Sequence, residues 1–326
     1  MIQLARTPGA MLCIAIALSG HLAAAAEVAD FPTRPIRLIN PYAPGGAVDF
    51  VARSVAQKLN ESWGQPVIVD NRPGAGTNIG TELVVRAAPD GYTMLLTSAV
   101  IATNVTLYRL AFDPVQDLAP IALVAQSPFV LAVHPAVPAK NISELVSLAK
   151  TKAGQITFGS AGAGTTTHLM LELFKSMAKV DILHVPYKGG GPAMNALLSG
   201  EVQTTFLPVT IVLPQARAGK IRALAVTSAR RVELAPDLPS VSESGLPGFD
   251  PIGWYAMFAP AATPRSLVNR INTVVNRGIQ QRDLQERMSA NGMVPVGGAP
   301  EVLRDYMKGE IARWGKVIKE SGIQPE

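Results

Sequence analysis

Short apolar runs alternate with helical periodicity over residues 36–96 of this sequence. Residues 36–39, 67–69 and 94–96 are apolar and are bounded by turn-forming residues, which predicts three buried strands. Between the first two runs, apolar residues recur on one helical face, at Val48, Val51, Ala52, Val55 and Leu59. Strands that alternate with helices in this way are typical of a parallel sheet with crossover helices.

A second series begins at residues 129–133 and repeats the alternation. Asn141, followed three residues later by Glu144, predicts the capped start of a helix over residues 142–149. Further apolar runs predict four more strands, at residues 156–158, 182–185, 204–206 and 223–226.

The pattern changes from Asp250 onwards, where residues 253–259 form one more apolar run. Three helices are then expected to begin at Thr263–Pro264 (with the threonine as N-cap), at Asp283 and at Pro300. We therefore predict an α/β fold of two lobes, each a central sheet flanked by helices. Lobe I would comprise residues 27–127 and 250–326, and lobe II residues 128–249.

The first 26 residues have the pattern of a secretory signal peptide. Arg6 is the only charged residue among them, residues 10–22 are almost wholly apolar and small, and four alanines follow at residues 23–26. The apolar run is shorter than the roughly 20 residues that a membrane-spanning helix needs. We therefore expect residues 1–26 to be a signal peptide and the protein to be periplasmic.

The amino-acid composition argues against thiol chemistry and against nucleic-acid binding. Cys13 is the only cysteine, so residues 27–326 can form no disulfide and carry no thiol chemistry. The net charge is +5, but the basic residues are scattered, and Arg230–Arg231 is their only adjacent pair. Nucleic-acid binding favours clustered basic residues, so this pattern argues against it, whereas it is compatible with mild attraction of a small anion.

A glycine-rich segment follows a predicted strand and precedes a predicted helix at two places, residues 41–49 and 159–168. At such a junction the first N–H groups of the helix lack partners and the helix dipole favours negative charge. Thr165, Thr166 and Thr167 add hydroxyl donors to the second segment. One such loop from each lobe could grip an anion, although ordinary strand–helix turns remain the alternative. A nucleotide is disfavoured because Thr165 stands where a P-loop requires lysine.

Catalytic machinery is not apparent in the sequence. Ser160 lies between a strand and a helix but outside any G-x-S-x-G motif. The histidines after the predicted signal peptide, His134, His168 and His184, are widely separated and form no zinc motif. We interpret His184 as a core residue, and His168 either as a ligand contact or as a group that caps or packs against its loop. The prediction is a non-enzymatic protein with no metal and no cofactor.

The ordered motifs along the chain resemble those of the Bug, or tripartite tricarboxylate transporter, substrate-binding receptors. The resemblance covers essentially all of residues 27–326. It rests on FPTRPI at residues 31–36, PGG at 44–46 with Asp49, DNRPGAG at 70–76, PDGYT at 89–93, GSAG at 159–162, HVPYKG at 184–189, GKIRALAVTS at 219–228 and residues 254–260.

This resemblance implies a two-lobed periplasmic-binding-protein fold, type II-like, that closes on a small carboxylate by hinge motion. Loops 42–49 and 160–168 would hold the carboxylate, and the loop at residues 76–80 would border the same cleft. The implied ligand-binding residues are Tyr42, Pro44, Gly45, Gly46, Ala47, Asp49, Asn78, Ser98, Ser160, Gly162, Ala163, Gly164, Thr165, Thr166, His168 and Leu207.

The family also implies a partner: the loaded receptor, a monomer, would deliver its ligand to inner-membrane transporter subunits. A periplasmic component of a signalling system is the alternative, and a secreted hydrolase is a remote one. Within the site, we expect Tyr42 to line the cleft and Asp49 to fix its own loop, because two carboxylates repel. Trp254 could form a wall of the pocket or pack at the hinge, and we interpret it as packing at the hinge.

Two positions depart from the family pattern. Ile101 stands where a histidine is often found, and Leu207 where an aspartate is often found. Both replace polar candidates with apolar ones, so we hypothesise that the distal part of the ligand is less polar than a dicarboxylic amino acid.

Overall fold

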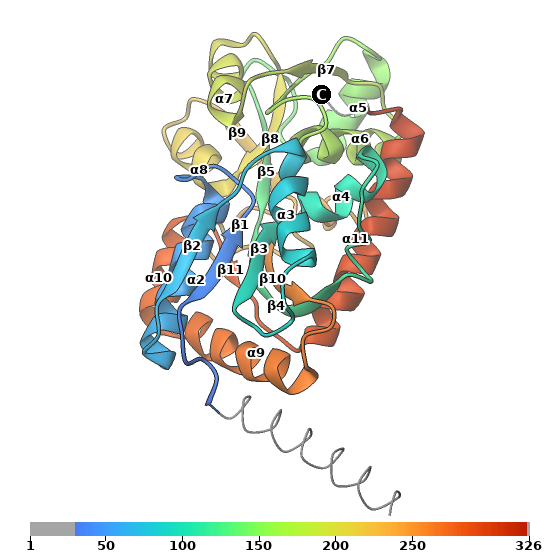
Figure 1. Cartoon of the computed structure of the whole chain (residues 1–326). Coiled ribbons are helices and arrows are strands. Elements are labelled where there is room, and N and C mark those ends of the chain that lie inside the picture. The colour runs from blue at the N-terminus through green and yellow to red at the C-terminus, as the bar shows by residue number, and fades with distance from the viewer. Residues whose placement is uncertain (1–29, 325–326) are drawn as a thin grey trace, which may run out of the picture.

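The computed structural model describes residues 30–324, which fold into two lobes, each built on its own β-sheet (Figure 1). The predicted signal peptide lies outside the described residues. The sheet of lobe I has the order β11-β4-β10-β3-β1-β2. Its strands are β1 (Ile36–Asn40), β2 (Val67–Asn71), β3 (Thr93–Ser98), β4 (Leu118–Ser127), β10 (Gly253–Pro260) and β11 (Val294–Pro295).

The sheet of lobe II has the order β7-β6-β8-β5-β9. Its strands are β5 (Phe129–Val133), β6 (Thr157–Ser160), β7 (Leu183–Pro186), β8 (Thr204–Pro208) and β9 (Arg222–Val226). The predicted α/β class and the two-lobed architecture are confirmed.

Helices cover both faces of each sheet. They are α2 (Ala47–Trp63), the short 3-10 helix η1 (Ala75–Thr77), α3 (Asn78–Val85), α4 (Val100–Leu107), α5 (Ile142–Thr151), α6 (Thr166–Ala178), α7 (Gly190–Ser199), α8 (Val209–Arg217), α9 (Arg265–Ile279), α10 (Arg282–Ala290) and α11 (Pro300–Ser321). In lobe I, α2, α9 and α10 pack on one face and α3, α4 and α11 on the other. No helix within residues 30–324 is both long and apolar enough to cross a membrane.

Strand direction places the loops of both lobes at the same boundary. β4 leads through Pro128 directly into β5, so β4 runs towards lobe II and β5 away from lobe I. β1, β2 and β3 run in the same direction as β4, because β10 is antiparallel to both β3 and β4. In lobe II, β8 is antiparallel to β5, and β6 and β7 run parallel to β8. The carboxyl ends of β1, β2 and β3 therefore face those of β6, β7 and β8.

The C-terminal helix α11 ties the lobes together along one side of the molecule (Figure 1). Leu303 and Met307 in its first half belong to a core of lobe I, whereas Trp314 and Ile318 in its second half belong to the core of lobe II. One helix thus buries apolar side chains in both lobes.

Glu310, at the middle of α11, is buried and links Trp254, which packs in a core of lobe I, to Trp314, which packs in the core of lobe II. Its Oε2 accepts hydrogen bonds from the indole N–H of Trp254 at 3.1 Å and of Trp314 at 3.0 Å. Arg313 lies 3.1 Å from the other oxygen. Burial raises the pKa of Glu310. Trp254 is fully buried here, as the hinge-packing interpretation expects.

Two helix starts show where local sequence signals succeed and fail. Asn141 caps α5 as predicted, since its side chain accepts a hydrogen bond from the backbone N–H of Glu144 at 2.9 Å. The predicted N-cap at Thr263 is wrong: α9 begins at Arg265 after Pro264, whose ψ of 134° is not helical. The threonine therefore lies one residue too early for its hydroxyl to cap the helix.

Replacing Glu310 with methionine tests the role of this buried carboxyl. The variant leaves two buried indole N–H groups without an acceptor, which should lower the free energy of unfolding by about 3 kcal/mol. Glu310→Gln keeps an acceptor oxygen and should lose less. The measurement is urea denaturation, with Glu320→Gln, an exposed change on the same helix, as the control. Equal stabilities of Glu310→Met and that control would contradict this role.

Candidate functional site

The first glycine-rich loop is held in shape by Asp49, which lies in the first turn of α2. One carboxylate oxygen accepts hydrogen bonds from the backbone N–H of Gly45 at 3.0 Å and from Arg53 at 2.8 Å. The other accepts from the Asn71 amide at 3.0 Å and, at 3.4 Å, from Asn40. The strands β1 and β2 and the loop are thereby joined at one side chain.

Burial alone would raise the pKa of Asp49, but the hydrogen bonds from Arg53, Gly45 and Asn71 outweigh it and bring the pKa to about 2. The carboxylate is thus charged and fully engaged at neutral pH. Its geometry is that of a group that fixes its own loop, as expected. Gly45 has a φ of 90°, which favours glycine.

Tyr42 and Ser98 bring the first loop and the end of β3 together. The phenol oxygen lies 2.5 Å from Ser98 Oγ. Burial raises the pKa of Tyr42 to about 12, so the phenol stays neutral and can act as a hydrogen-bond donor. Both residues are half-buried at the edge of lobe I that faces lobe II.

A third loop stands at the same edge, after β2. Asn104 in α4 donates hydrogen bonds to the backbone oxygen of Gly76 at 2.6 Å and to the side-chain oxygen of Asn78 at 2.8 Å. The buried amide of Asn104 thus orients the half-buried Asn78. The sequence signals pointed to Asn78 but not to Asn104.

The second glycine-rich loop, between β6 and α6, is shaped by its own hydroxyls. Thr165 Oγ1 donates to the backbone oxygen of Gly162 at 2.7 Å. Thr167 Oγ1 accepts from the N–H of Ala161 at 2.8 Å. Ser160 Oγ accepts from the N–H of Gly162 at 3.1 Å. Thr166, Ala163 and Gly164 are half-buried at the surface of this loop.

Two histidines support this loop from beneath. The rings of His168 and His184 stack with centroids 3.7 Å apart and planes inclined by 12°. His168 Nδ1 accepts from the N–H of Gly164 at 3.0 Å, and His184 Nε2 lies 2.6 Å from Ser160 Oγ. One imidazole therefore holds the start of the loop at Ser160, the other holds its middle at Gly164, and the stack holds the two imidazoles together.

Burial lowers the pKa of both histidines to about 4, so both rings are neutral at pH 7. His168 accepts a hydrogen bond at Nδ1, which places its proton on Nε2, 3.9 Å from Glu172. The interpretation of His184 as an ordinary core residue missed its contact with the loop. The signal that could have revealed it is the pairing of β7 with β6, which sets His184 beside Phe158, two residues before Ser160.

The strand directions bring the predicted residues of both lobes to facing edges. Pro44, Gly45, Gly46 and Ala47 are exposed at the start of α2. The helices α2 and α6, with 17 and 13 residues, both begin at this boundary, and within the described chain neither start is capped by a side chain.

The side chains of Leu207 and Ile101 lie in the cores of the lobes and not at these facing edges. Leu207 has no exposed surface and belongs to a core of lobe II, beneath α7. Ile101 is 2% exposed in a core of lobe I. Neither side chain reaches the surface of its lobe here, and the ligand role of Leu207 stays a prediction.

The site offers hydrogen-bond donors rather than catalytic groups. The 2.6 Å contact between Ser160 and His184 has the spacing of a nucleophile and its base. Ser160 is fully buried, however, and its oxygen already accepts the N–H of Gly162. Within residues 30–324, no cluster of three or more His, Cys, Asp or Glu side chains is placed to hold a metal ion.

The chain is similar to known proteins along most of its length. The family model described as "Tripartite tricarboxylate transporter family receptor" matches residues 51–323. A curated relative, the "UPF0065 protein in tcbD-tcbE intergenic region" of Pseudomonas sp. (strain P51), is 40% identical over 309 residues, which are 94% of this chain and 92% of the relative.

Two solved structures are similar along nearly their whole length. "R. palustris Rpa4515 with adipate" is 36% identical with a TM-score of 0.75, and the match covers 91% of this chain and 100% of that one. "MatC (Rpa3494) from Rhodopseudomonas palustris with bound malate" is 33% identical with a TM-score of 0.71, covering 88% and 100%.

The stacked histidines should make stability depend on pH. Their pKa is about 4 in the folded chain against an ordinary value of 6.5, so between these values the unfolded state binds more protons. The neutral histidines therefore stabilise the folded state fully above pH 6.5. This stabilisation is lost as the pH falls towards 4, by up to about 1.4 kcal/mol per pH unit for each histidine.

We expect the double variant His168→Gln, His184→Gln to flatten this dependence in urea denaturation between pH 6.5 and 4. His134→Gln, which removes a histidine outside the stacked pair, should keep the wild-type slope. A double variant with that same slope would show that the pair does not titrate as described.

Proposed function

Because the chain belongs to the tripartite tricarboxylate transporter receptor family, we propose that it is a periplasmic receptor that captures a small carboxylate between its lobes, without altering it, for delivery to a membrane transporter. The observation that carries this proposal is the pair of glycine-rich loops at facing strand ends, one in each lobe. The loops at residues 41–48, 74–80 and 160–168 form the proposed ligand site.

Charge in this site comes from backbone and helix ends. None of the three loops contains lysine or arginine. The uncapped starts of α2 and α6 supply N–H groups and the positive ends of two helix dipoles. Thr166 adds a neutral hydroxyl, and so does Tyr42 when Ser98 donates to the phenol oxygen, whereas the Thr165 hydroxyl is engaged with the Gly162 carbonyl. Such a site binds a carboxylate by hydrogen bonds and can release it without breaking a buried ion pair.

Both loops are fixed before a ligand arrives. Asp49 holds the first loop, and the stacked His168 and His184 hold the second. Preorganised donors cost less entropy on binding. We further propose that the lobes divide near residues 128 and 250, where the chain crosses between the sheets, and that hinge motion there closes the loops around the ligand.

Two similar structures support a proposal for the ligand class. Structures similar to this chain carry adipate and malate, which are dicarboxylates. We propose a ligand of the same class: one carboxylate between the two glycine-rich loops, and the remainder facing the third loop and Ser98.

Replacing Gly46 with leucine tests the first loop. Gly46 has a φ of −86°, and a Cβ atom added there would meet no described atom within 4 Å, so the fold should tolerate the change. The leucine would cover the start of α2, so affinity should fall about tenfold to a hundredfold. The measurement is isothermal titration calorimetry with a panel that includes adipate, malate and aspartate.

Gly309→Leu is the matched control, because Gly309 is an exposed glycine of α11 that likewise has no described atom near its Cβ position. It should bind as the wild type does. Undiminished binding by Gly46→Leu would remove the first loop from the site. Hydrolysis of an ester or amide that disappears in Ser160→Ala would replace the receptor by an enzyme.

A further inference from the structure

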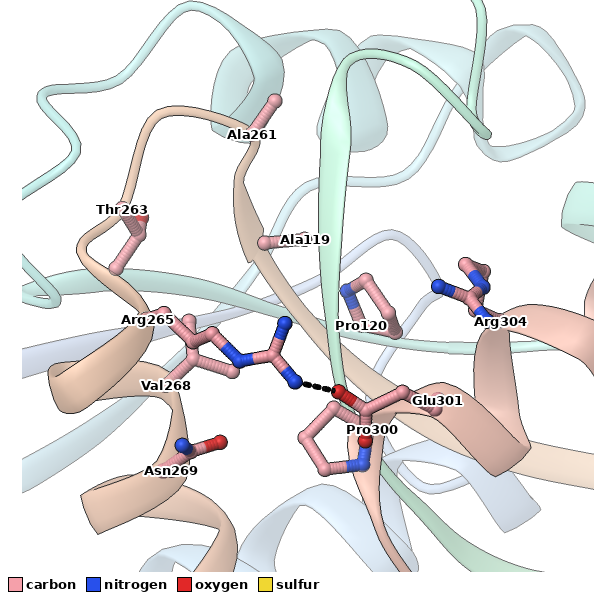
Figure 2. Close-up of a pocket in the computed structure, with 10 residues that line it drawn as sticks. All are labelled: Ala119, Pro120, Ala261, Thr263, Arg265, Val268, Asn269, Pro300, Glu301 and Arg304. Carbon is pink, nitrogen blue, oxygen red and sulfur yellow. Dashed lines mark hydrogen bonds and ion pairs between the residues drawn. The ribbon is translucent and has the colours of Figure 1, made fainter.

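A cavity of about 210 Å³ lies at the opposite end of lobe I from the proposed ligand site. Figure 2 shows the residues that line it. Four segments line it: the start of β4, the turn after β10, the start of α9 and the start of α11. β4 runs from this end towards lobe II, and β10 ends here, so the cavity is separated from the facing loops by the length of the sheet.

Two arginines, Arg265 and Arg304, and one acidic residue, Glu301, line this cavity. Both arginines are ion-paired: Arg265 with Glu301, and Arg304 with Asp305, its neighbour on α11, at 2.9 Å. The helices α9 and α11, with 15 and 22 residues, both begin at the cavity, and no side chain within residues 30–324 caps either start. Because the side-chain charges balance, the positive potential at the cavity comes from the positive ends of these two helix dipoles.

A buried hydroxyl is an independent sign that a polar ligand belongs here. Thr263 lines the cavity and is only 6% exposed, yet its Oγ1 has no hydrogen-bond partner among the described residues. A buried hydroxyl without a partner is destabilising unless something else satisfies it. The late start of α9 leaves this hydroxyl unused, since the helix does not take it as a cap.

An incoming anion can replace an acidic side chain as the partner of an arginine in this cavity. Arg265, whose side chain is 79% exposed, forms an ion pair with Glu301 across the cavity (Figure 2). An exposed pair of this kind is weak, so an anion with stronger hydrogen bonds can take the place of the Glu301 carboxylate. Arg304 and Asn269 line other sides of the same space. The ion pair of Arg304 with Asp305 is exposed as well, so an anion can displace that carboxylate in the same way.

We propose that this cavity binds a small tetrahedral oxyanion of the phosphate class. Donors from several directions (the two guanidinium groups, the Asn269 amide and the Thr263 hydroxyl) suit an anion with three or four acceptor oxygens better than the two of a carboxylate. The site is separate from the carboxylate site and does not depend on the proposed function. The phosphate could be free in solution or the headgroup of an anionic lipid.

Inorganic phosphate is the probe, titrated into the purified protein and followed by calorimetry at low ionic strength. Arg304→Gln should weaken binding by about tenfold, since it removes a charge-assisted hydrogen bond. Glu301→Gln should strengthen it several-fold, because it frees Arg265 and removes a repulsive charge. Arg282→Gln, which removes an exposed, ion-paired arginine of α10, should bind as the wild type does.

Gly46→Leu separates the two sites, because phosphate binding at this cavity should survive that change. Loss of phosphate binding in Gly46→Leu, no binding by the wild type at millimolar phosphate, or equal binding by Arg304→Gln and Glu301→Gln would overturn the proposal. Sedimentation with phosphatidylglycerol and phosphatidylcholine vesicles identifies the source. Retention on phosphatidylglycerol that Arg304→Gln abolishes supports a lipid headgroup, and phosphate binding without retention supports the free anion.

Discussion

The direction in which the chain crosses between its two sheets is the constraint on which the rest of this structure depends. β4 continues into β5 with only Pro128 between them, so the two sheets are joined head to tail. Every strand parallel to β4 then ends at the boundary with lobe II, and every strand antiparallel to β5 ends at the boundary with lobe I. Loops that are distant in sequence, at Gly46 and at Thr165, come to face each other for this reason alone.

Each of the facing loops is stabilised by a polar network of a different kind. The first uses a charged carboxylate that receives four hydrogen bonds, and the second uses two neutral imidazoles and a serine. In both, the donors and acceptors of side chains beneath the loop are occupied within the lobe. Under the proposed function, the backbone N–H groups on the exposed side are the donors that would bind an anion, although the loops contain no basic residue.

Much of the fold could be predicted from sequence because its signals are local. Apolar runs bounded by turns located most of the strands, the spacing of Asn141 and Glu144 located a helix cap, and Pro300 located the start of α11. The buried strand β4 escaped notice because its apolar run contains Pro120 and has no alternation. The two glycine-rich loops could be located from their position between a predicted strand and a predicted helix, and the family resemblance added the third loop, Ser98 and Leu207.

The remaining features depend on contacts between distant segments. The contact of His184 with Ser160 follows from strand pairing across 24 residues, which no local pattern encodes. The burial of Ile101 and Leu207 likewise depends on packing, so their apolar character alone did not reveal whether they face the ligand. Thr263 was predicted as a cap because Thr-Pro is a common helix start, but the backbone at Pro264 delays the helix.

In the proposed receptor, one carboxylate is held by both glycine-rich loops at once. A crystal structure of the protein with the tightest-binding dicarboxylate tests it most directly. We predict a carboxylate within hydrogen-bond distance of N–H groups at the start of α2 and of α6, with the lobes closed around it. A ligand bound to one lobe only, or away from both helix starts, would contradict the proposal that both loops hold the carboxylate.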